Sequence, residues 1–473
     1  MKNLVTLVAL SVAFSMNAQT GNTNTGTGSL SSNTTGDYNS AFGQEALYSN
    51  TTGDGNTALG FASLQQNTDG ANNTASGYNS LGSNTSGFAN SAFGYDALSS
   101  NNFGDANTAI GEGALKSNTS GSFNTAAGYS ALISNTTGSG NTATGEEALG
   151  SNNTGLNNTA NGAQALSSNT TGYYNTASGY QSLYSNTTGS FNIASGYHSL
   201  YSNTTGTFNT ASGYNSLKNN TTGYQNTATG GVSLSGNTTG DQNTAYGAFS
   251  LSYNTDGDYN TASGHQSLSS NTTGSNNTGL GYKAQASSAT ATNQTIIGFE
   301  ATGQADNSVV LGNDDVTAVY MAEDRGAKIY AGEGDFSGDI VTAGNVTVSS
   351  DIRLKKDIVN LPSTIDNIKS LRPVAYSKKS SLSSEEYGST EIGLIAQELQ
   401  EVYPNMVSED GSKEPLLSVS YMELIPVLIK GMQEQQRMIE NQEAVMKNQQ
   451  SMIENQQAVN EEQQKMIEKL MAK

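Results

Sequence analysis

Glycine, asparagine, alanine and leucine recur at fixed positions through more than half of the chain. A glycine stands every 17 residues from Gly36 to Gly274, and a second glycine follows each one after seven residues. Asparagine, alanine and leucine come three, five and eleven residues after the first glycine, and the fifteenth copy is degenerate, with Gly279 and Gln285 in the last two places. A short, strict period without insertions predicts a solenoid, in which stacked coils align like residues in ladders.

Each repeat predicts how one coil is built. The motif Asn-Thr-Ala-x-Gly is expected to form a short strand with alanine inward and threonine outward, because successive side chains alternate faces. A second strand is expected around the leucine, and both glycines are expected at tight corners with positive φ. A helix is disfavoured, since each interior glycine costs about 1 kcal/mol. Fifteen coils at about 4.8 Å each predict a rod of roughly 70 Å.

One chain has few apolar residues with which to fill the interior of such a rod. Each coil offers essentially one alanine and one leucine to a core, while ordering each residue costs about 1–2 kcal/mol. We therefore expect several chains to pack their leucine ladders together, and a homotrimer is the natural closed assembly.

The composition of the sequence changes after the repeats. Short apolar clusters and glycines between Val316 and Ser349 predict a β connector. Of the 20 Lys and Arg residues, 14 lie from Arg353 onward, which marks a domain boundary near Ser349.

A heptad pattern closes the chain. Hydrophobic residues recur every seven positions from Met438 to Met466, without Pro or Gly, which predicts a coiled coil. The other core position holds Gln442, Gln449, Gln456 and Gln463, and such layers lower stability while fixing register. A solvated single helix is the alternative.

Composition excludes several functional classes. The chain has no cysteine, and we expect no cofactor or metal. The net charge is −20, and the only basic residues between Gly36 and Thr290 are Lys116, Lys218 and Lys283, so nucleic acid is not an expected partner. Calcium binding would need an aspartate in nearly every coil, but only a minority have one after the first glycine. The two histidines, His198 and His265, are expected to face solvent without a partner.

The first residues predict export. Lys2 precedes an apolar stretch too short to span a bilayer, and a small-residue cleavage site ends at Ala18. The alternative is a buried N-terminal helix. No later stretch reads as a transmembrane segment, so we expect an extracellular or cell-surface protein.

The repeats resemble the head repeats of trimeric autotransporter adhesins. Those heads are left-handed parallel β-rolls with a similar N-[ST]-x-A-x-G signature, and the segment Asn293–Asn313 is closer still to them. The period of 17 is longer than is typical of that family. The resemblance implies the fold more strongly than an adhesive role.

The region from Ser350 to Met432 resembles the S74 peptidase family, the C-terminal intramolecular chaperone of endosialidases and phage tail fibres. The phrases SSDIRLKKDIVNLPSTIDNIKSLRPVAYSKK, IGLIAQELQEVYPNMV and LLSVSYMELIPVLIKGM occur in the family's order. The resemblance implies a domain that trimerises, guides folding of the fibre before it, and cuts itself off before a serine. The signature S-D-x-[RK]-x-K falls on Ser350, Asp351, Arg353 and Lys355.

The residues of this signature suit autoproteolysis. Ser350 becomes a nucleophile when a base removes its proton, and a neutral Lys355 can do so, the cut falling between Ser349 and Ser350. Burial favours a neutral lysine, and we expect trimer assembly to supply it. Asp351 and Arg353 would support the site, and Lys356 is the rival base. In a purely structural reading, Ser350 caps a short helix. Some family members are thought to use a histidine in this domain, and none follows His265.

Gly393, Gln397 and Tyr421 also match family positions, and we read them as packing and trimer contacts.

These observations combine into one predicted organisation. We expect a mainly β protein divided as follows: signal peptide 1–18, lead-in 19–35, solenoid 36–290, head-like repeat and connector 291–349, a small α+β chaperone-protease domain 350–432, and coiled coil 433–473.

The function expected from this organisation is an exported trimeric fibre that matures by one self-cut. An adhesin whose rod binds glycan or protein, with an uncleaved clasp, is the alternative. Ice binding by the threonine ladder and a phage tail fibre are further alternatives. A polysaccharide-degrading enzyme lacks a catalytic carboxylate pair.

Overall fold

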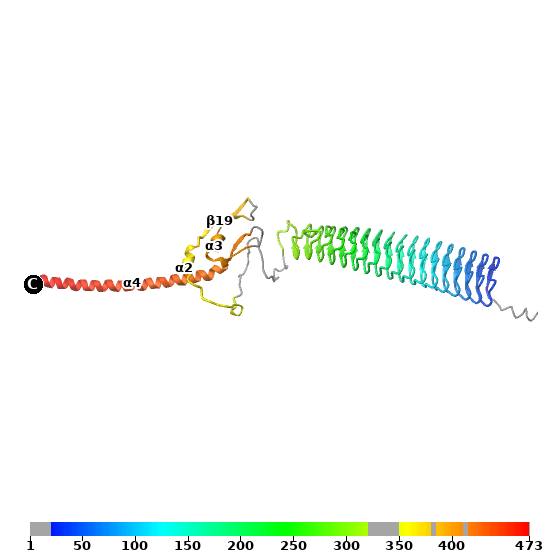
Figure 1. Ribbon diagram of the computed structural model, residues 1–473, viewed down its shortest axis with the longest axis horizontal. Helices are drawn as coiled ribbons and strands as arrows, with labels where there is room; N and C mark the ends of the chain where they lie inside the picture. The colour runs from blue at the N-terminus through cyan, green and yellow to red at the C-terminus, as the bar shows by residue number, and fades with distance from the viewer. Residues whose placement is uncertain (1–19, 320–349, 380–384, 410–414, 473) are drawn as a thin grey trace, which may run out of the picture. The chain divides into compact units, whose positions relative to one another are not determined.

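The computed structural model describes residues 20–319, 350–379, 385–409 and 415–472 (Figure 1). The chain divides into two compact units, residues 1–327 and 328–473. The predicted signal peptide (1–18), most of the predicted connector and Ser349 lie outside the described residues.

The first unit is the predicted parallel β-solenoid. One short strand per coil pairs in parallel with the strand of the next coil, and alanines stack in register, as in Ala177, Ala194 and Ala211. The strands are β1 (Thr23–Thr25), β2 (Ser40–Phe42), β3 (Thr57–Leu59), β4 (Thr74–Ser76), β5 (Ser91–Phe93), β6 (Thr108–Ile110), β7 (Thr125–Ala127), β8 (Thr142–Thr144), β9 (Thr159–Asn161), β10 (Thr176–Ser178), β11 (Ile193–Ser195), β12 (Thr210–Ser212), β13 (Thr227–Thr229), β14 (Thr244–Tyr246), β15 (Thr261–Ser263), β16 (Thr278–Leu280), β17 (Gln294–Ile297) and β18 (Ser308–Leu311).

The sheet continues past both ends of the repeat that the sequence marks. β1 lies in the predicted lead-in and pairs with β2 in the same 17-residue register. After β16 the sheet adds β17 and β18, and the last step shortens to 14 residues, with Thr295 opposite Val309. The head-like segment is therefore a continuation of the solenoid.

Alternation within each strand is as predicted. The central alanine of strands β2 to β15 is fully buried, while the flanking threonines are exposed or half-buried. The sequence period of two therefore gives the inner and outer faces of the strand correctly.

The predictions of a second strand around the leucine and of a leucine ladder shared between chains are wrong. The leucine lies in a turn, with φ near +50°, as in Leu183 (52°) and Leu200 (51°). This left-handed conformation turns the coil back on itself and points the leucine at the alanine ladder. From Leu47 to Leu268 these leucines are 0% exposed within one chain, so they are not available for packing between chains.

Two ladders of buried asparagines add hydrogen bonds between coils to the apolar contacts of alanine and leucine. In the first, Asn186 Nδ2 donates to Asn169 Oδ1 at 2.8 Å and to the Gly189 carbonyl at 2.9 Å. In the second, the backbone N–H of Asn192 donates to Asn175 Oδ1 at 3.0 Å. Every coil thus satisfies buried polar groups of its neighbour, which ties the stack together within one chain.

The two glycines of each coil have different roles. The second glycine has positive φ, as predicted, for example 131° at Gly196. The first does not, so that part of the prediction is wrong. A Cβ on Gly189 would lie 2.4 Å from Asn186 Oδ1 and 2.5 Å from the Gly206 carbonyl oxygen, so close coil approach excludes a side chain there.

The second unit is a small α+β region followed by a long helix. Its elements are η1 (Ile352–Leu354), α2 (Ile365–Ser370), β19 (Val374–Lys379), β20 (Tyr387–Gly393), α3 (Ala396–Val402), η2 (Pro404–Met406), β21 (Val407–Glu409), β22 (Leu417–Val419) and α4 (Tyr421–Met471). β19 pairs antiparallel with β20, and β21 with β22. α2 packs on the first turns of α4, where Gly431 makes room for Ile368.

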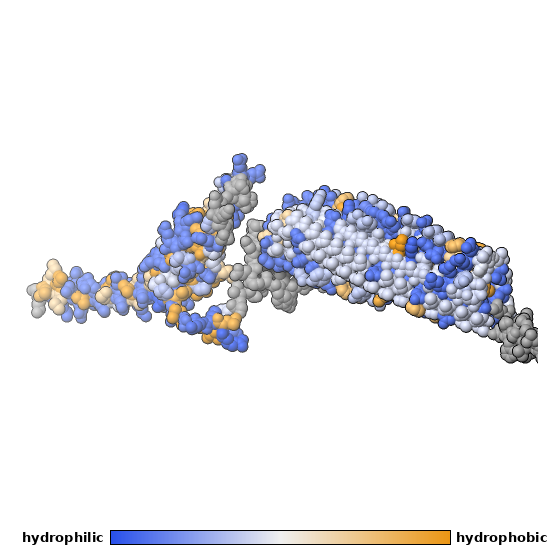
Figure 2. All heavy atoms as spheres, turned by 45° about the vertical axis from the view of Figure 1, so that its right-hand side comes forward, coloured by the Kyte–Doolittle hydropathy of each residue, from blue (hydrophilic) through white to orange (hydrophobic). Residues whose placement is uncertain are grey.

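Helix α4 is 51 residues long, or about 75 Å, and hydrophobic residues recur along it between hydrophilic ones (Figure 2). Among the described residues, the buried residues of α4 lie in its first turns, at Leu424, Val427 and Gly431. Residues Met438, Ile439, Val445, Met446, Met452, Ile453, Val459, Met466 and Ile467 are each 42% to 64% exposed. In the parts of the chain that the structure describes, no helix is both long and apolar enough to cross a membrane.

Candidate functional site

The structure brings Ser350 and Lys355 together. Lys355 Nζ donates a hydrogen bond of 2.7 Å to Ser350 Oγ, and both residues are exposed. The turn η1 lies between them, and the Lys355 backbone N–H donates to the Ile352 carbonyl at 3.1 Å. This turn folds the lysine back toward the serine five residues earlier.

Asp351 organises the same turn. Its Oδ1 accepts from the backbone N–H of Arg353 at 2.9 Å, so Asp351, and not Ser350, caps η1. The Arg353 guanidinium also binds this carboxylate, through Nε at 3.0 Å and Nη2 at 2.7 Å. Arg353 thereby holds the pKa of Asp351 below its usual value, and Asp351 raises the pKa of Arg353.

The two candidate bases point in different directions. Lys356 Nζ lies 4.0 Å from Asp357 Oδ2, and its hydrogen-bond partners do not include Ser350. Lys355 is the lysine in contact with the hydroxyl. This contact places the amine within reach of the hydroxyl proton that a general base would take.

A glutamate of helix α4 caps the N-terminus of helix α2. Glu434 of α4 accepts hydrogen bonds from Ser363 Oγ at 3.1 Å and from the backbone N–H groups of Thr364 and Ile365 at 3.1 and 3.2 Å. These donors form the N-terminus of α2. Sequence reasoning missed Glu434, because no local pattern marks a contact across about 70 residues.

Two of the residues read as packing contacts meet within one chain. Tyr421 Oη accepts from the backbone N–H of Leu394 at 2.9 Å. A Cβ on Gly393 would lie 2.4 Å from this oxygen and 2.9 Å from Tyr376 Oη. Only glycine therefore lets the start of α4 close on the end of β20, while Gln397 is exposed.

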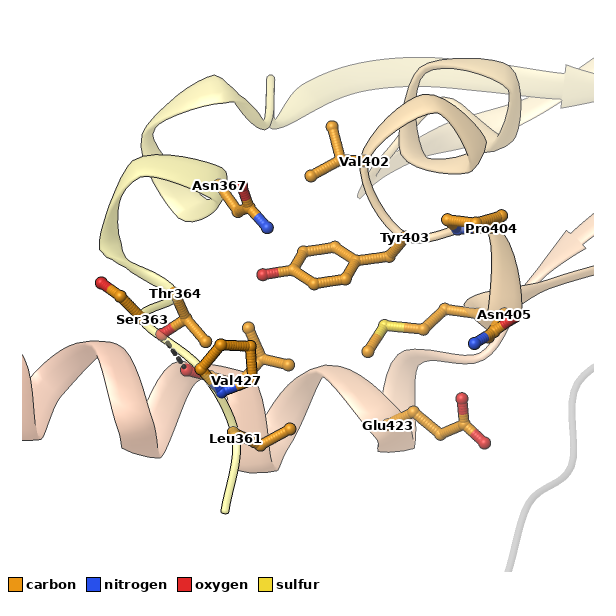
Figure 3. Close-up of a pocket in the computed structure, with 12 residues that line it drawn as sticks. Leu361, Ser363, Thr364, Asn367, Val402, Tyr403, Pro404, Asn405, Glu423 and Val427 are labelled. Carbon is orange, nitrogen blue, oxygen red and sulfur yellow. Dashed lines mark hydrogen bonds between the residues drawn. The ribbon is translucent and has the colours of Figure 1, made fainter. Parts of the chain in front are cut away.

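A mostly apolar cavity of about 360 Å³ lies between α2, α3 and α4 (Figure 3). It is lined by Leu361, Thr364, Val402, Tyr403, Met406 and Val427, among others. No pattern in the sequence groups these residues.

Side chains on the solenoid surface bind the backbone of neighbouring coils. Aspartates after the first glycine bind backbone: Asp241 Oδ1 accepts from the Tyr224 N–H at 2.9 Å, and Asp258 Oδ1 from the Asp241 N–H at 2.8 Å. Serine does the same in other coils, as Ser190 Oγ does for Tyr173. No cluster of three metal-ligating side chains occurs among the described residues.

Both histidines have partners, contrary to the prediction. His198 Nε2 lies 2.8 Å from Gln181 Oε1, and its ring contacts that of Tyr197. His265 stacks on Tyr282 at 5.6 Å. Burial and then the charge of Lys218 lower the pKa of His198.

Comparison with known families bears on this second unit. Residues 350–408 match the model of the Peptidase_S74 family, described as the chaperone of endosialidase, which confirms the resemblance seen in the sequence. Domains of this family act in trimeric fibres. The matched segment contains Ser350, Asp351, Arg353 and Lys355.

The chain is also distantly similar to the long tail fiber protein Gp37 of several phages. It is 30% identical over 155 residues to the protein of Enterobacteria phage T2, a stretch that covers 30% of this chain and 11% of that protein. For Enterobacteria phage K3 the identity is 30% over 149 residues, covering 29% and 12%. The chain thus spans only about a tenth of the length of these relatives.

Proposed function

We propose that this chain is an exported, trimeric, fibre-like structural protein whose C-terminal domain assists assembly and then releases itself by one cut before Ser350. The observation that carries the proposal is the contact between Lys355 Nζ and Ser350 Oγ within the segment that matches the S74 model. The solenoid supplies a long, regular shaft whose coils need no partner chain to bury their core.

The cut proceeds in two steps. A neutral Lys355 takes the hydroxyl proton, and Ser350 Oγ attacks the carbonyl carbon of Ser349. The C–N bond between the two residues breaks, the Ser350 nitrogen leaves as a free amine after taking a proton, and an ester links Ser349 to Ser350 Oγ. Water then hydrolyses the ester, leaving a carboxyl on Ser349 and restoring the hydroxyl of Ser350. Each chain is cut once, so there is no turnover.

Helix α4 supports self-association. Its exposed residues follow the heptad from Met438 to Met466, the arrangement that packs helices side by side in a coiled coil. Glutamines occupy the alternate core position and lower the stability of the bundle. A trimer clasp of moderate stability suits a domain that is released after assembly.

The charged start and short apolar stretch of residues 1–18 support export, and we propose that the mature fibre is extracellular or displayed on a cell surface.

The experiment is direct. The chain from Gln19 is expressed, its oligomeric state is measured by sedimentation, and the N-terminus of the smaller fragment is sequenced. A trimer whose small fragment starts at Ser350 supports the proposal, and a fragment that starts elsewhere contradicts the assigned site.

A second candidate function is glycan binding by the rod. Tyr180, Tyr197 and Tyr214 form a stacked row with ring centroids 5.6 and 5.5 Å apart, and each ring is 44% to 55% exposed. The exposed edges and hydroxyls of these stacked rings, beside amide side chains such as Gln181, are suited to contacting sugar rings and bonding their hydroxyls. Binding of the full chain to an immobilised glycan panel, lost in Tyr197→Ala and retained in Tyr253→Ala, would support this role.

A further inference from the structure

The row of stacked tyrosines on the solenoid ends abruptly at Tyr214. Tyr180, Tyr197 and Tyr214 each follow the second glycine of their coil, and their rings stack from coil to coil. The next two coils carry Gly231 and Ala248 at this position, so no ring continues the row there. We call the space over these two small residues the gap.

The gap leaves one face of the Tyr214 ring without a stacking partner. Tyr197 covers the other face, with 5.5 Å between ring centroids and 16° between ring planes, and no second ring contacts Tyr214 among the described residues. The next coil is adjacent, because the Val232 N–H donates to the Tyr214 carbonyl at 2.8 Å. A Cβ on Gly231 would nevertheless meet nothing within 4 Å. The open face of Tyr214 is therefore accessible to a flat ligand, and this side chain is 55% exposed.

Hydroxyl groups border the gap on the side of the sheet. Thr229 ends β13 and Tyr246 ends β14, two residues before Gly231 and Ala248, and the two strands pair them in register. Both side chains are exposed on the outer face of the sheet. Phe249, which is 43% exposed, follows Ala248 on the other side. The gap thus combines an open aromatic face, a floor of small residues and hydroxyls that can donate and accept hydrogen bonds.

The coils around Tyr214 carry almost no charge. Although the chain has a net charge of −20, Lys218 is the only charged residue between Glu147 and Asp241. Burial and the charge of Lys218 lower the pKa of His198, which favours its neutral form. A charged ligand would lose hydration here with little compensation from ion pairs, so this part of the rod suits a neutral ligand.

The two ends of the tyrosine row are not equivalent. Beyond Tyr180 the same position holds Ala163 and then Glu146, whose carboxylate is exposed. Beyond Tyr214 it holds glycine first, which leaves more room next to the ring, and the following residue is an uncharged alanine. The end at Tyr214 is therefore the better place for a neutral ligand.

A sugar ring matches the gap better than the apolar side chain of a protein partner. One face of a sugar ring is made of C–H groups that pack on an aromatic face, and its rim carries hydroxyls that pair with polar side chains. An apolar anchor of a protein binds tightly where a packed pocket excludes water. Around the gap, Tyr214, Thr229 and Tyr246 are all exposed, so water reaches the rim that a sugar tolerates.

We propose that the rod binds a neutral oligosaccharide at the gap, with one sugar ring on the open face of Tyr214 above Gly231. Thr229 and Tyr246 bond its hydroxyls. Three coil steps separate Tyr214 from His265, where rings resume, or about 14 Å at the usual strand spacing, so a short linear chain fits along the rod axis. The proposal rests on the second candidate function, glycan binding by the rod, and names its ligand class and its main contact.

Filling the gap tests this assignment. Gly231→Phe supplies a ring that stacks on Tyr214 and covers its open face. The fold should tolerate this ring, because a Cβ at Gly231 has open space and the backbone there does not have positive φ. Gly231→Ala is the matched control, since a methyl group leaves most of the face open. Circular dichroism melts check that each variant stays folded.

Binding to the full chain from Gln19 is measured by calorimetry with cellohexaose, laminarihexaose and maltohexaose as neutral probes and oligosialic acid as the acidic comparator. We expect the natural chain and Gly231→Ala to bind at least one neutral probe. Gly231→Phe and Tyr214→Ala should bind that probe at least about tenfold more weakly, a loss of about 1.4 kcal/mol or more. Tyr253→Ala, at an exposed tyrosine outside the row, should bind it as the natural chain does.

The results that overturn the assignment are distinct from those that overturn glycan binding. Equal binding by Gly231→Phe and the natural chain would place the glycan elsewhere on the rod and leave the candidate function standing. Binding of oligosialic acid without any neutral probe would overturn the ligand class. If the natural chain binds none of the probes and no glycan of the immobilised panel, the candidate function fails with the assignment, and the partner of the open ring is a protein.

Discussion

Asn203 Nδ2 donates a hydrogen bond of 2.8 Å to Asn186 Oδ1, one coil earlier, and both side chains are fully buried. Asn186→Ala removes this contact and leaves Asn169 Oδ1 without the 2.8 Å bond that it accepts from Asn186. We expect a loss of about 2–4 kcal/mol in the local stability of these coils. Hydrogen exchange of the coil amides measures it, and Thr188→Ala, at an exposed neighbouring position, should have little effect.

Two glycines make a matched pair for coil packing. An alanine at Gly189 would place its Cβ 2.5 Å from the Gly206 carbonyl oxygen, whereas a Cβ at Gly231 would meet nothing within 4 Å. Gly189→Ala should lower the free energy of unfolding by about 1–3 kcal/mol or more, because the backbone cannot move aside. Gly231→Ala should stay within about 0.5 kcal/mol. Equal effects in denaturant titrations would contradict the steric account.

Glu434 should make the docking of α2 on α4 sensitive to acid. Burial raises the pKa of this carboxyl, but hydrogen bonds from Thr364, Ser363 and Ile365 lower it by more than burial raises it. The net pKa of Glu434 therefore lies below the ordinary 4.5. A carboxyl with a lowered folded-state pKa stabilises the fold above its unfolded value, and this stabilisation is lost as pH falls through the folded value.

Glu434→Gln should therefore weaken α2 protection at neutral pH and flatten its loss below about pH 4.5. Hydrogen exchange of α2 as a function of pH measures both. Glu440→Gln, an exposed position on the same helix, is the control and should leave the natural profile unchanged. A Glu434→Gln profile that matches the natural one would show that the cap contributes nothing.

The strict period made much of the solenoid predictable. Alanine inward and threonine outward follow from strand alternation, and stacking in register follows from a fixed repeat without insertions. The turn at each leucine could not be predicted from the repeat. Leucine rarely adopts a left-handed conformation, which costs about 1–2 kcal/mol, yet Leu200 has φ of 51°. Full burial offsets that strain, and burial of this kind depends on the closed coil, which a single repeat does not reveal.

The candidate site was predictable only where its residues are local. Ser350 and Lys355 lie five residues apart, and one turn joins them. Glu434 acts through contacts between elements far apart in the chain, so no periodicity marks it. The alternative in which Ser350 caps a short helix is wrong, because Asp351 caps η1; both are good capping residues, and only geometry separates them.

Lys355 and Lys356 should behave differently. Lys355→Gln removes the side chain that contacts Ser350 Oγ and should abolish the cut, whereas Lys356→Gln should leave most of it. Gel analysis of purified trimers over time measures both. Loss of the cut only in Lys356→Gln would assign the base to the other lysine.

The most direct test of the central claim is the intact mass of the purified chain from Gln19 and of its Ser350→Ala counterpart. The account predicts two fragments that meet between Ser349 and Ser350 in the natural chain, and a single uncut mass in the variant. An uncut mass from both, with trimers formed, would contradict self-cleavage and leave the C-terminal domain as a clasp.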